Sequence, residues 1–432
     1  MNKRGAAEGY PLSWRHVGFV VAVAAMGLVG VALLLNSSGI FYRSVADEFG
    51  VGLGQVSFYI SLSYIASMPL LPLGARLMER WSVRGIYVVV NIALAVAFFL
   101  NAMAVNVWMM YVAGVLSCGC IVFNMYLMPV LVARWFKKRV GFVVGLAGSC
   151  TGLGAAIWNV MGSAIITTAG WRVGYAVFGA MVLAIIVPLV LLFVRSNPED
   201  VGIKRYGSSE GDEDVAHIQR TEAVTGADYA AVVKSPAFFL LIVMSLCGGL
   251  VAVMSQYLTS FALDAGYIAL VGASMTSAAM VGNMLTKIVF GGLADKSLLS
   301  SVLGAVVLPG IALAGLMLIG GGSTIGVVSM AFLFGGVQPS NTVILPLVVR
   351  GVFGEKDYSR IWASVSPFSA LACAVGATIW GWIYDGTGSF YLVFVIGISL
   401  LVIRLVAYLA AARSARGVPH TVETTVRGDA AR

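Results

Sequence analysis

Long apolar segments alternate with short polar ones along most of the chain, and this alternation is its dominant pattern. An apolar segment of about 20 residues crosses the roughly 30 Å hydrocarbon core of a bilayer as a helix. We predict two sets of six such helices, near residues 16–41, 54–78, 84–103, 107–133, 140–168 and 173–194, and near residues 236–262, 268–293, 298–319, 323–349, 360–383 and 388–411. The expected fold is therefore an all-α polytopic membrane protein with twelve transmembrane helices.

One polar stretch, Arg195 to Lys234, is longer than the others and separates the two sets of helices. It contains Gly207, Ser208 and Ser209, followed by an acidic cluster from Glu210 to Asp214, a composition typical of a solvated linker. We therefore expect an N-terminal six-helix bundle, a cytoplasmic linker, a C-terminal six-helix bundle and a cytoplasmic tail, at residues 1–195, 196–234, 235–412 and 413–432.

The composition agrees with a membrane protein. Hydrophobic residues make up 59% of the chain and charged residues 11%, whereas a soluble domain has about 45–50% and 25%. The net charge of +8 does not indicate a nucleic-acid partner, because the charges lie between the apolar segments. The five cysteines lie inside apolar segments without the spacing of a disulfide framework or a metal site, so we interpret them as packing residues.

The distribution of Lys and Arg predicts the orientation. Alternate loops carry most of these residues, including Lys3, Arg4, Arg15, Arg76, Arg80, Arg84, Arg134, Lys137, Lys138 and Arg139, whereas the other loops keep only Arg43 and Arg172. Because cationic residues accumulate in cytoplasmic loops, we expect both termini in the cytoplasm and the chain in the inner (plasma) membrane. The first apolar segment is too long for the apolar part of a signal peptide, so we expect it to be a retained helix.

Two loops at matching places in the predicted halves share a charged pattern. The first reads GARLMERWSVR from Gly74 to Arg84, and the second reads GGLADK from Gly291 to Lys296. Both resemble the signature loop of the major facilitator superfamily, in which Gly is followed after three residues by Asp and then by Arg or Lys. The resemblance implies charge pairs that break when the halves move, formed by Glu79, Arg80, Arg84, Asp295 and Lys296.

The first copy departs from the signature, because Ala75 stands at the first Gly, Glu79 at the Asp and Ser82 at the second Gly. For either copy alone, ordinary charged turns are the alternative interpretation. Recurrence in both halves favours an internal repeat, a common construction among membrane transporters.

Further stretches resemble one branch of that superfamily, the monocarboxylate and oxalate/formate porters: Gly39 to Tyr64, Ala133 to Ser149, Arg195 to Gly207 and Phe353 to Ser364. The segment GWIYDGTGSF, Gly381 to Phe390, is shared more widely. The resemblance covers the whole chain. It implies two pseudo-symmetric six-helix bundles and secondary transport of a small organic anion by alternating access.

Polar side chains are costly in a bilayer and tend to face a cavity or a partner. Here they gather on predicted helices 1, 4, 7 and 10, which supports a central site between the halves. The candidate substrate-binding residues are Asn36, Tyr64, Asn124, Tyr126, Asn159, Gln256, Tyr257, Asn283, Lys287, Gln338 and Asn341. Helix 5 is rich in glycine, including Gly141, Gly145, Gly148, Gly152 and Gly154, and close helix packing is favoured over substrate contact there.

Lys287 is the strongest candidate for a role in the chemistry. It lies eight residues before Asp295, about 12 Å from the cytoplasmic end of helix 8, with no acidic residue within one turn. An unpaired buried ammonium loses its proton, extends to the membrane–water interface or binds an anion that comes from outside the protein. A substrate carboxylate is the favoured partner, and an anchoring or helix-packing role is the alternative.

The resemblance sharpens this hypothesis. The oxalate/formate and monocarboxylate porters carry Arg at the helix 8 position where this chain has Lys287. The oxalate type also has a helix 11 Lys, where this chain has Val365, which favours a monoanion over a dianion. Monocarboxylate porters place a proton-carrying Asp where this chain has Asn283, which excludes proton coupling through that residue. Arg404, in predicted helix 12, is interpreted as structural, with a stem long enough to reach the interface.

Other classes of function remain alternatives. An enzyme is disfavoured because His16, His217 and His420 lie in the tails or linker, and a channel because no filter motif is present. A membrane sensor with a transporter fold, or an exporter of a drug-like or uncharged substrate, stays open. The absence of a P-loop indicates a gradient-driven process without a cofactor. The expected partners are the substrate, a coupling ion or counter-substrate and the lipid bilayer, with the chain as a monomer.

Overall fold

The computed structural model describes residues 12–137, 139–207, 224–319, 322–354, 357–415 and 420–423. The acidic cluster of the linker and His217 therefore lie outside the described residues. So do the side chains of Glu79, Asp295 and His420, while the backbones of these three residues are described.

The helices of the N-terminal half match the first six predicted spans. They are α1 (Trp14–Ala25) with its π-helical continuation Met26–Asn36, α2 (Gly39–Phe49), α3 (Leu53–Arg80), α4 (Val83–Ala102), α5 (Val107–Leu116), the π-helical segment Cys120–Tyr126, α6 (Met128–Trp135), α7 (Val140–Ala169), α8 (Trp171–Met181), the π-helical segment Val182–Ile186 and α9 (Val187–Phe193). A 3₁₀ turn, Pro198–Val201, follows them.

The C-terminal half repeats the arrangement. It consists of α11 (Tyr229–Val232), α12 (Pro236–Val253), the 3₁₀ segment Met254–Tyr257, α13 (Leu258–Asp264), α14 (Ala269–Lys296), α15 (Leu298–Ile319), α16 (Thr324–Phe334), the 3₁₀ segment Gly335–Val337, the π-helical segment Ser340–Ile344, α17 (Leu345–Phe353), α18 (Tyr358–Thr387) and α19 (Tyr391–Ser414). Two short strands, β1 (Val224–Ala227) and β2 (His420–Glu423), pair antiparallel beside the bundle. We did not predict this pair, because both segments have the composition of a linker and a tail.

In the part of the chain that the structure describes, ten helical segments are long and apolar enough to cross a membrane. The bent pair Val107–Leu116 and Cys120–Tyr126 makes up to eleven. The remaining predicted span corresponds to α3, a continuous helix of 28 residues that does not pass the same test. The polytopic helical fold is therefore confirmed, and the count of twelve is not confirmed in full.

The predicted helices 1, 4, 7 and 10, which carry most of the polar residues, all depart from regular α geometry, and so does helix 6 at the π-helical segment Val182–Ile186. In helix 4 the π-helical segment Cys120–Tyr126 lies just before Pro129, and in helix 10 the segment Ser340–Ile344 lies just before Pro346. Proline has no N–H to donate, so the hydrogen-bonding pattern changes where it enters a helix. Pro367, by contrast, lies inside the continuous helix α18. These matching breaks are consistent with the pseudo-symmetry of the halves.

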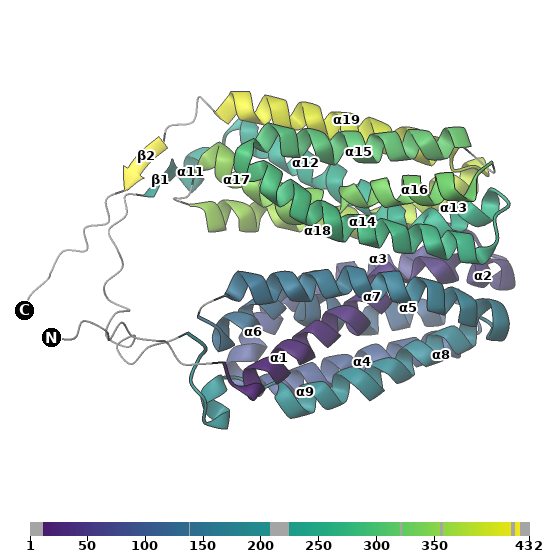
Figure 1. The fold of residues 1–432 in the computed structure, drawn as a ribbon, viewed down its shortest axis with the longest axis horizontal. Helices are drawn as coiled ribbons and strands as arrows, with labels where there is room; N and C mark the ends of the chain where they lie inside the picture. Colours follow the sequence, from purple (N-terminus) through teal and green to yellow (C-terminus); the bar gives the residue numbers. More distant parts are fainter. Residues whose placement is uncertain are drawn as a thin grey trace, which may run out of the picture.

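Figure 1 shows the halves as two layers of long helices, with the C-terminal half drawn above the N-terminal half. The start of α1 and the end of α19 lie at the same end of the molecule, which we call the terminal end, and α2 and α13 lie at the opposite end. The two layers contact each other through α3 with α18 and through α7 with α14. One buried hydrophobic cluster runs through the N-terminal half and continues into the C-terminal half, where it includes residues of α13, α15, α16 and α19. A second cluster lies where α17 packs against the start of α12 and the end of α19.

Candidate functional site

Buried hydrogen bonds join the halves near the opposite end. Tyr42 Oη donates to Gln256 Oε1 at 2.6 Å, and Gln256 Nε2 donates to the carbonyl of Leu35 at 3.1 Å. Tyr257 Oη is hydrogen-bonded to Ser57 Oγ at 2.9 Å. Gln256 and Tyr257, which we expected at the substrate site, therefore make contacts between the halves.

An acidic residue of α18 caps α3 across the same interface. The Asp385 carboxylate accepts hydrogen bonds from the backbone N–H of Leu53 at 2.9 Å and of Gly54 at 3.0 Å. These N–H groups belong to the first turn of α3, where helix backbones have no internal partner and favour a negative charge. The close approach requires glycine, since a Cβ on Gly54 would lie 2.4 Å from the Trp382 ring. The helix of one half is thus capped by the other half.

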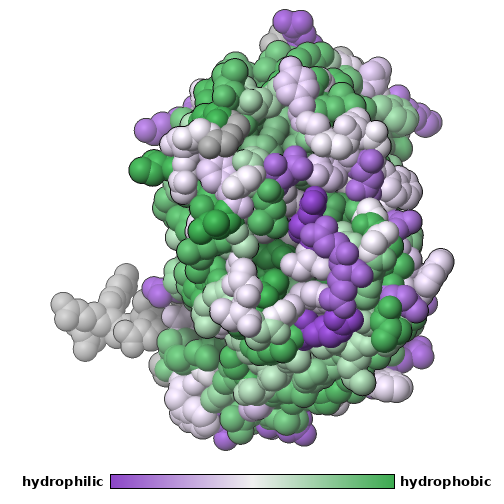
Figure 2. Space-filling view, turned by 90° about the vertical axis from the view of Figure 1, so that its right-hand side faces the viewer, coloured by the Kyte–Doolittle hydropathy of each residue, from purple (hydrophilic) through white to green (hydrophobic). Residues whose placement is uncertain are grey.

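Charged residues surround this contact at the surface of the opposite end. Arg43 pairs with Asp47 at 3.2 Å and donates to Tyr384 Oη at 3.3 Å, which connects α2 with α18. Hydrogen bonds from Arg172 and then from Trp171 hold the pKa of the Glu48 carboxyl below its usual value. Figure 2 looks at this end and shows hydrophilic side chains gathered in the middle of a largely hydrophobic surface.

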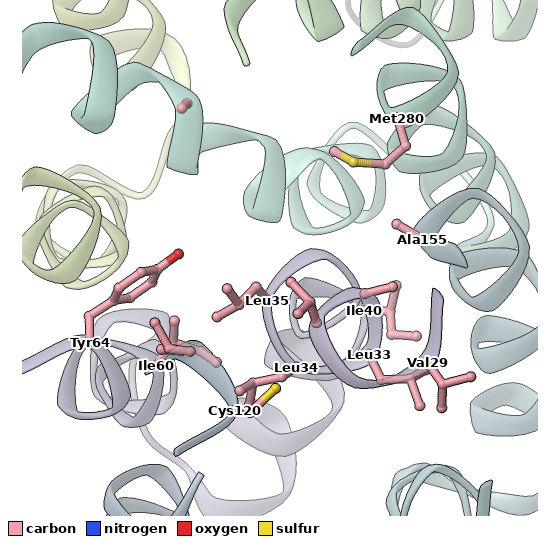
Figure 3. Packing of buried hydrophobic residues seen from close by; sticks show 14 of the residues in the cluster. Val29, Leu33, Leu34, Leu35, Ile40, Ile60, Tyr64, Cys120, Ala155 and Met280 are labelled. Atoms are coloured by element: carbon pink, nitrogen blue, oxygen red, sulfur yellow. The ribbon is translucent and has the colours of Figure 1, made fainter. Parts of the chain in front are cut away.

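The interface opens toward the terminal end. Along α7 and α14, Ser277 Oγ donates to the carbonyl of Ala156 at 2.7 Å, and a Cβ on Gly152 would lie 3.4 Å from the carbonyl oxygen of Met280. Figure 3 shows Ala155 and Met280 on either side of this contact. One and two turns further, a Cβ on Gly148 or Gly145 would meet nothing within 4 Å. The predicted packing role therefore holds at Gly152 but not at these two glycines.

Lys287 lies on α14 at the level of this opening. Because α7 and α14 run antiparallel, a count of seven residues along each helix from Gly152 and Met280 brings Gly145 and Lys287 to about the same level. The lysine is half-buried, and within the described residues it has no hydrogen bond or ion pair. Asn283, one turn away on the same face, is buried, and its Oδ1 has no partner in the described part of the structure. The two side chains form a polar stripe beside the glycines.

The N-terminal half contributes further polar groups near the middle of the molecule. Tyr64 is 7% exposed, and Figure 3 shows its hydroxyl directed from α3 toward the helices of the other half. Tyr126, at the end of the π-helical segment Cys120–Tyr126, is half-buried. Asn36 is half-buried, and Asn159 is fully buried, with neither atom of its amide paired among the described residues. The polar candidates of the N-terminal half are therefore spread over several helices and do not form one compact cluster.

Three predicted residues make polar contacts inside their own half. Asn124 Nδ2 donates to Asn91 Oδ1 at 2.9 Å. Gln338 Nε2 donates to the carbonyl of Ala252 at 3.3 Å, and Asn341 Nδ2 donates to Ser369 Oγ at 2.7 Å. Each contact ties a central helix to a neighbour, so these side chains have a structural partner in this conformation.

Of the signature-loop residues, Arg80, Arg84 and Lys296 are exposed at the terminal end. The side chains of Glu79 and Asp295 lie outside the described residues, so the predicted charge pairs stay a prediction. Asp385 was not predicted as a functional residue. Its available signal was its place in the segment GWIYDGTGSF, which is shared widely within the resembled superfamily.

Arg404 differs from expectation. Its side chain is 1% exposed, so it does not extend to the surface of the molecule, as a side chain that reaches the membrane–water interface would. Instead, its Nη2 donates to the carbonyl of Ser340 at 2.7 Å, at the start of the π-helical segment of helix 10. The guanidinium passes Gly248, where a Cβ would lie 2.1 Å from Arg404 Nη1. The absence of a side chain at this position makes the buried conformation possible.

Comparisons with known proteins agree with this architecture. The family model described as Major Facilitator Superfamily matches residues 16–350. Human Monocarboxylate transporter 11 is 24% identical over 417 residues, which cover 92% of this chain and 83% of the human protein. The fold is similar to an inward-facing, occupied bacterial homologue of the human lysosomal transporter Spinster (TM-score 0.69, 11% identity, 94% and 98% of the chains covered). It is equally similar to a D-xylose–proton symporter (TM-score 0.69, 13% identity, 93% and 97% covered).

Proposed function

Because the chain belongs to the major facilitator superfamily and is a transporter rather than an enzyme, we propose that it carries a small monocarboxylate across the membrane. The single observation that supports this substrate class is Lys287, an ammonium group without a carboxylate partner in the described residues beside an open stretch of the interface. The relatives named monocarboxylate transporters, from human and mouse, support the same class at 22–24% identity.

Charge counting favours one carboxylate per cargo molecule. A buried carboxylate is stable only when it is paired, and a second unpaired one would keep its full desolvation cost. Lys287 offers one positive charge, while Asn283 and the Tyr64 hydroxyl are neutral polar groups that suit the rest of a hydroxy or oxo acid. A dianion such as oxalate would leave one charge unmatched.

Transport by alternating access requires the halves, residues 1–195 and 235–412 in this proposal, to rock about the central site. The described hydrogen bonds at the opposite end and the space beside Gly145 and Gly148 support a conformation that opens toward the terminal end. We assign that end to the cytoplasm, as the Lys and Arg distribution predicts. This conformation is then inward-open.

Energy for accumulation comes from a gradient. The Asn283 side chain cannot bind and release a proton as a carboxylate would, so exchange against another anion or symport with another ion is the expected coupling. The chain works as a monomer in this proposal.

The test is uptake of a labelled monocarboxylate into proteoliposomes at matched protein density. Lys287→Gln should reduce the initial rate at least about tenfold, because loss of one buried charge pair costs more than about 1.4 kcal/mol. Lys234→Gln, which removes an exposed lysine before α12, is the matched control and should transport like the wild type. Unlabelled lactate-sized acids should compete better than oxalate.

Equal initial rates and equal half-saturation for Lys287→Gln and the wild type would return Lys287 to a structural role. Tighter competition by oxalate than by any monoacid would show that a second cation faces the site. Uptake that does not saturate with substrate would contradict carrier-type transport altogether.

A further inference from the structure

A small pocket lies at the terminal end, away from the central site. Its volume is about 120 Å³, and its walls include Trp14, Arg15, Trp135, Phe193 and Arg195. It is formed where the start of α1 meets the end of α9, two elements that lie next to each other in Figure 1. Nothing in the proposed transport cycle uses this pocket.

Packing contacts give the pocket a defined shape. A Cβ on Gly18 would lie 2.1 Å from the Phe193 ring, so the ring rests directly on the α1 backbone. Trp14 meets the same ring edge-on, with centroids 6.2 Å apart. On the other side, Trp135 Nε1 donates to the carbonyl of Arg195 at 3.2 Å. The aromatic walls and the arginine backbone are therefore fixed relative to each other.

Two guanidinium groups line this pocket with unused donors. Arg15 Nη1 donates to the carbonyl of Val201 at 2.6 Å. Arg195 Nη1 donates to the carbonyls of Leu191 at 3.0 Å and Val194 at 2.7 Å, which are free at the end of α9. The Arg15 guanidinium also lies over the Trp14 ring, 5.3 Å from its centroid. Each guanidinium has five N–H donors, and neither group has another hydrogen-bond partner among the described residues. Most of the donors remain available to a ligand.

The local charge is positive. Burial and then the nearby guanidinium groups of Arg84 and Arg15 lower the pKa of Arg195, while Asp200 acts in the opposite direction. Three cations thus face one carboxylate, which offsets only part of the repulsion among them within the described residues. A bound anion would remove it, and phosphate oxygens match the planar donor fork of arginine.

The apolar surroundings indicate the kind of molecule that carries the phosphate. Trp14 and Leu192, at the ends of two membrane spans, are 68% and 67% exposed, as in an aromatic belt at the headgroup level of a bilayer. Val17 and Val21 continue an exposed apolar strip along α1. Free inorganic phosphate has no apolar part that could contact this strip, whereas the acyl chain of a phospholipid can pack against it.

We propose that this pocket binds the phosphate group of an anionic phospholipid, with Arg15 and Arg195 as its ligands and an acyl chain against the exposed face of α1. Basic pockets between helices on the cytoplasmic side of membrane proteins suit such headgroups. The lipid links α1 to the end of the sixth span and so stabilises the N-terminal half.

The test uses the purified full-length chain in a neutral detergent and measures the melting temperature as lipid is added. Phosphatidylglycerol should raise it at lower concentrations than phosphatidylcholine. Arg15→Gln/Arg195→Gln should weaken the apparent affinity for phosphatidylglycerol about thirty-fold, because each cation at a membrane surface contributes about a fivefold factor. Lys234→Gln/Arg413→Gln, which removes two exposed cations from the other half at the same end, should bind like the wild type.

An equal loss of affinity for phosphatidylglycerol in both double variants would mean that general surface charge attracts the lipid, and it would contradict a specific site in this pocket. A shift by glycerol 3-phosphate or inorganic phosphate as large as that by phosphatidylglycerol would overturn the lipid assignment. If the pocket double variant does not fold, Arg15→Gln alone decides the matter, with an expected loss of about fivefold. Unchanged affinity in that variant would also contradict the proposal.

Discussion

The buried position of the Arg404 side chain depends on a glycine, Gly248, in another helix. The guanidinium is buried in the C-terminal half, and its Nη1 has no hydrogen-bond partner among the described residues. It fits only because Gly248 has no side chain, since a Cβ there would lie 2.1 Å from both Arg404 Nη1 and Asn341 Oδ1. Arg404 Nη2 donates to the carbonyl of Ser340, at the start of the π-helical segment, so the guanidinium supports the break in helix 10.

Gly248→Ala is therefore expected to lower the stability of the protein. The added methyl group must displace a buried guanidinium, and overpacking of this kind costs about 1–3 kcal/mol. The melting temperature in detergent, measured for the variant and the wild type, checks this. Gly310→Ala in α15 is the control, because a Cβ there meets nothing within 4 Å, and its melting temperature should stay the same or rise slightly. Equal melting temperatures for the two variants would mean that the Arg404 guanidinium can move away from the added methyl group without loss of stability.

The composition of the candidate site was predictable at this scale, but its geometry was not. A polar residue in an apolar segment indicates a buried partner, and Lys287 is a candidate for this reason, whereas Asn283 is a candidate because monocarboxylate porters have Asp at its position. Gln256 and Tyr257 carry the same signal and yet join the halves. Sequence periodicity does not say which neighbour a helix face meets, so it cannot separate a substrate contact from a contact between halves. We interpret Arg404 as structural from the sequence, but its burial against Gly248, 156 positions away, is not predictable from the residues around it.

Helices as elements were predictable because length and hydropathy determine them in a bilayer, where backbone groups must be paired internally. Each predicted span overlaps a helix or a run of helical segments in the structure. The breaks inside the spans were less accessible. Pro129 and Pro346 indicate two of them, whereas the π-helical segment Met26–Asn36 contains no proline and depends on contacts with other helices.

The N-terminus of α3 provides a prediction about elements. Asp385→Asn keeps one acceptor oxygen for the N–H groups of Leu53 and Gly54 but removes the charge that favours a helix N-terminus. We expect contacts at the opposite end to open about fivefold more often, since such a charge contributes about 1 kcal/mol. A cysteine at position 61, in a background without other cysteines, should react correspondingly faster with an impermeant thiol reagent added outside.

The control for this experiment is Asp47→Asn with the same cysteine. Asp47 pairs with Arg43 within α2, so its loss removes no direct contact between the halves. Faster labelling in the Asp47 variant than in the Asp385 variant would assign closure to the surface charges. Unchanged labelling rates in both variants would show that Asp385 does not help to keep this end closed.

For the whole molecule, the contacts between the halves are unevenly distributed. Helices α3 with α18 and α7 with α14 meet closely toward the opposite end, while the glycines of α7 face open space toward the terminal end. An arrangement that is closed at one end and open at the other is what a carrier needs, because both ends open together would form a leak. The orientation of the molecule in the membrane then determines which side receives the cargo.

Cysteine accessibility tests that orientation. Cysteines at positions 210 and 420, in the linker and the tail, should resist an impermeant thiol reagent in intact cells and react after the cells are opened. A cysteine at position 47, exposed at the opposite end, should react in intact cells. Rapid labelling of position 210 but not of position 420 would require an odd number of spans between them and would contradict the division into two bundles.

The capping of α3 by Asp385 also has an evolutionary consequence. On the α3 side the contact is made by backbone N–H groups, which only proline removes outright, and the close approach also requires glycine at positions 52 and 54. Any side chain at position 52 or 54 would block the approach, so we expect graded heritable variation in the strength of this contact mainly at position 385 and at the residues that position its carboxylate. A lineage that needs a faster or slower cycle can obtain it by changing a single codon without altering the residues that bind the cargo.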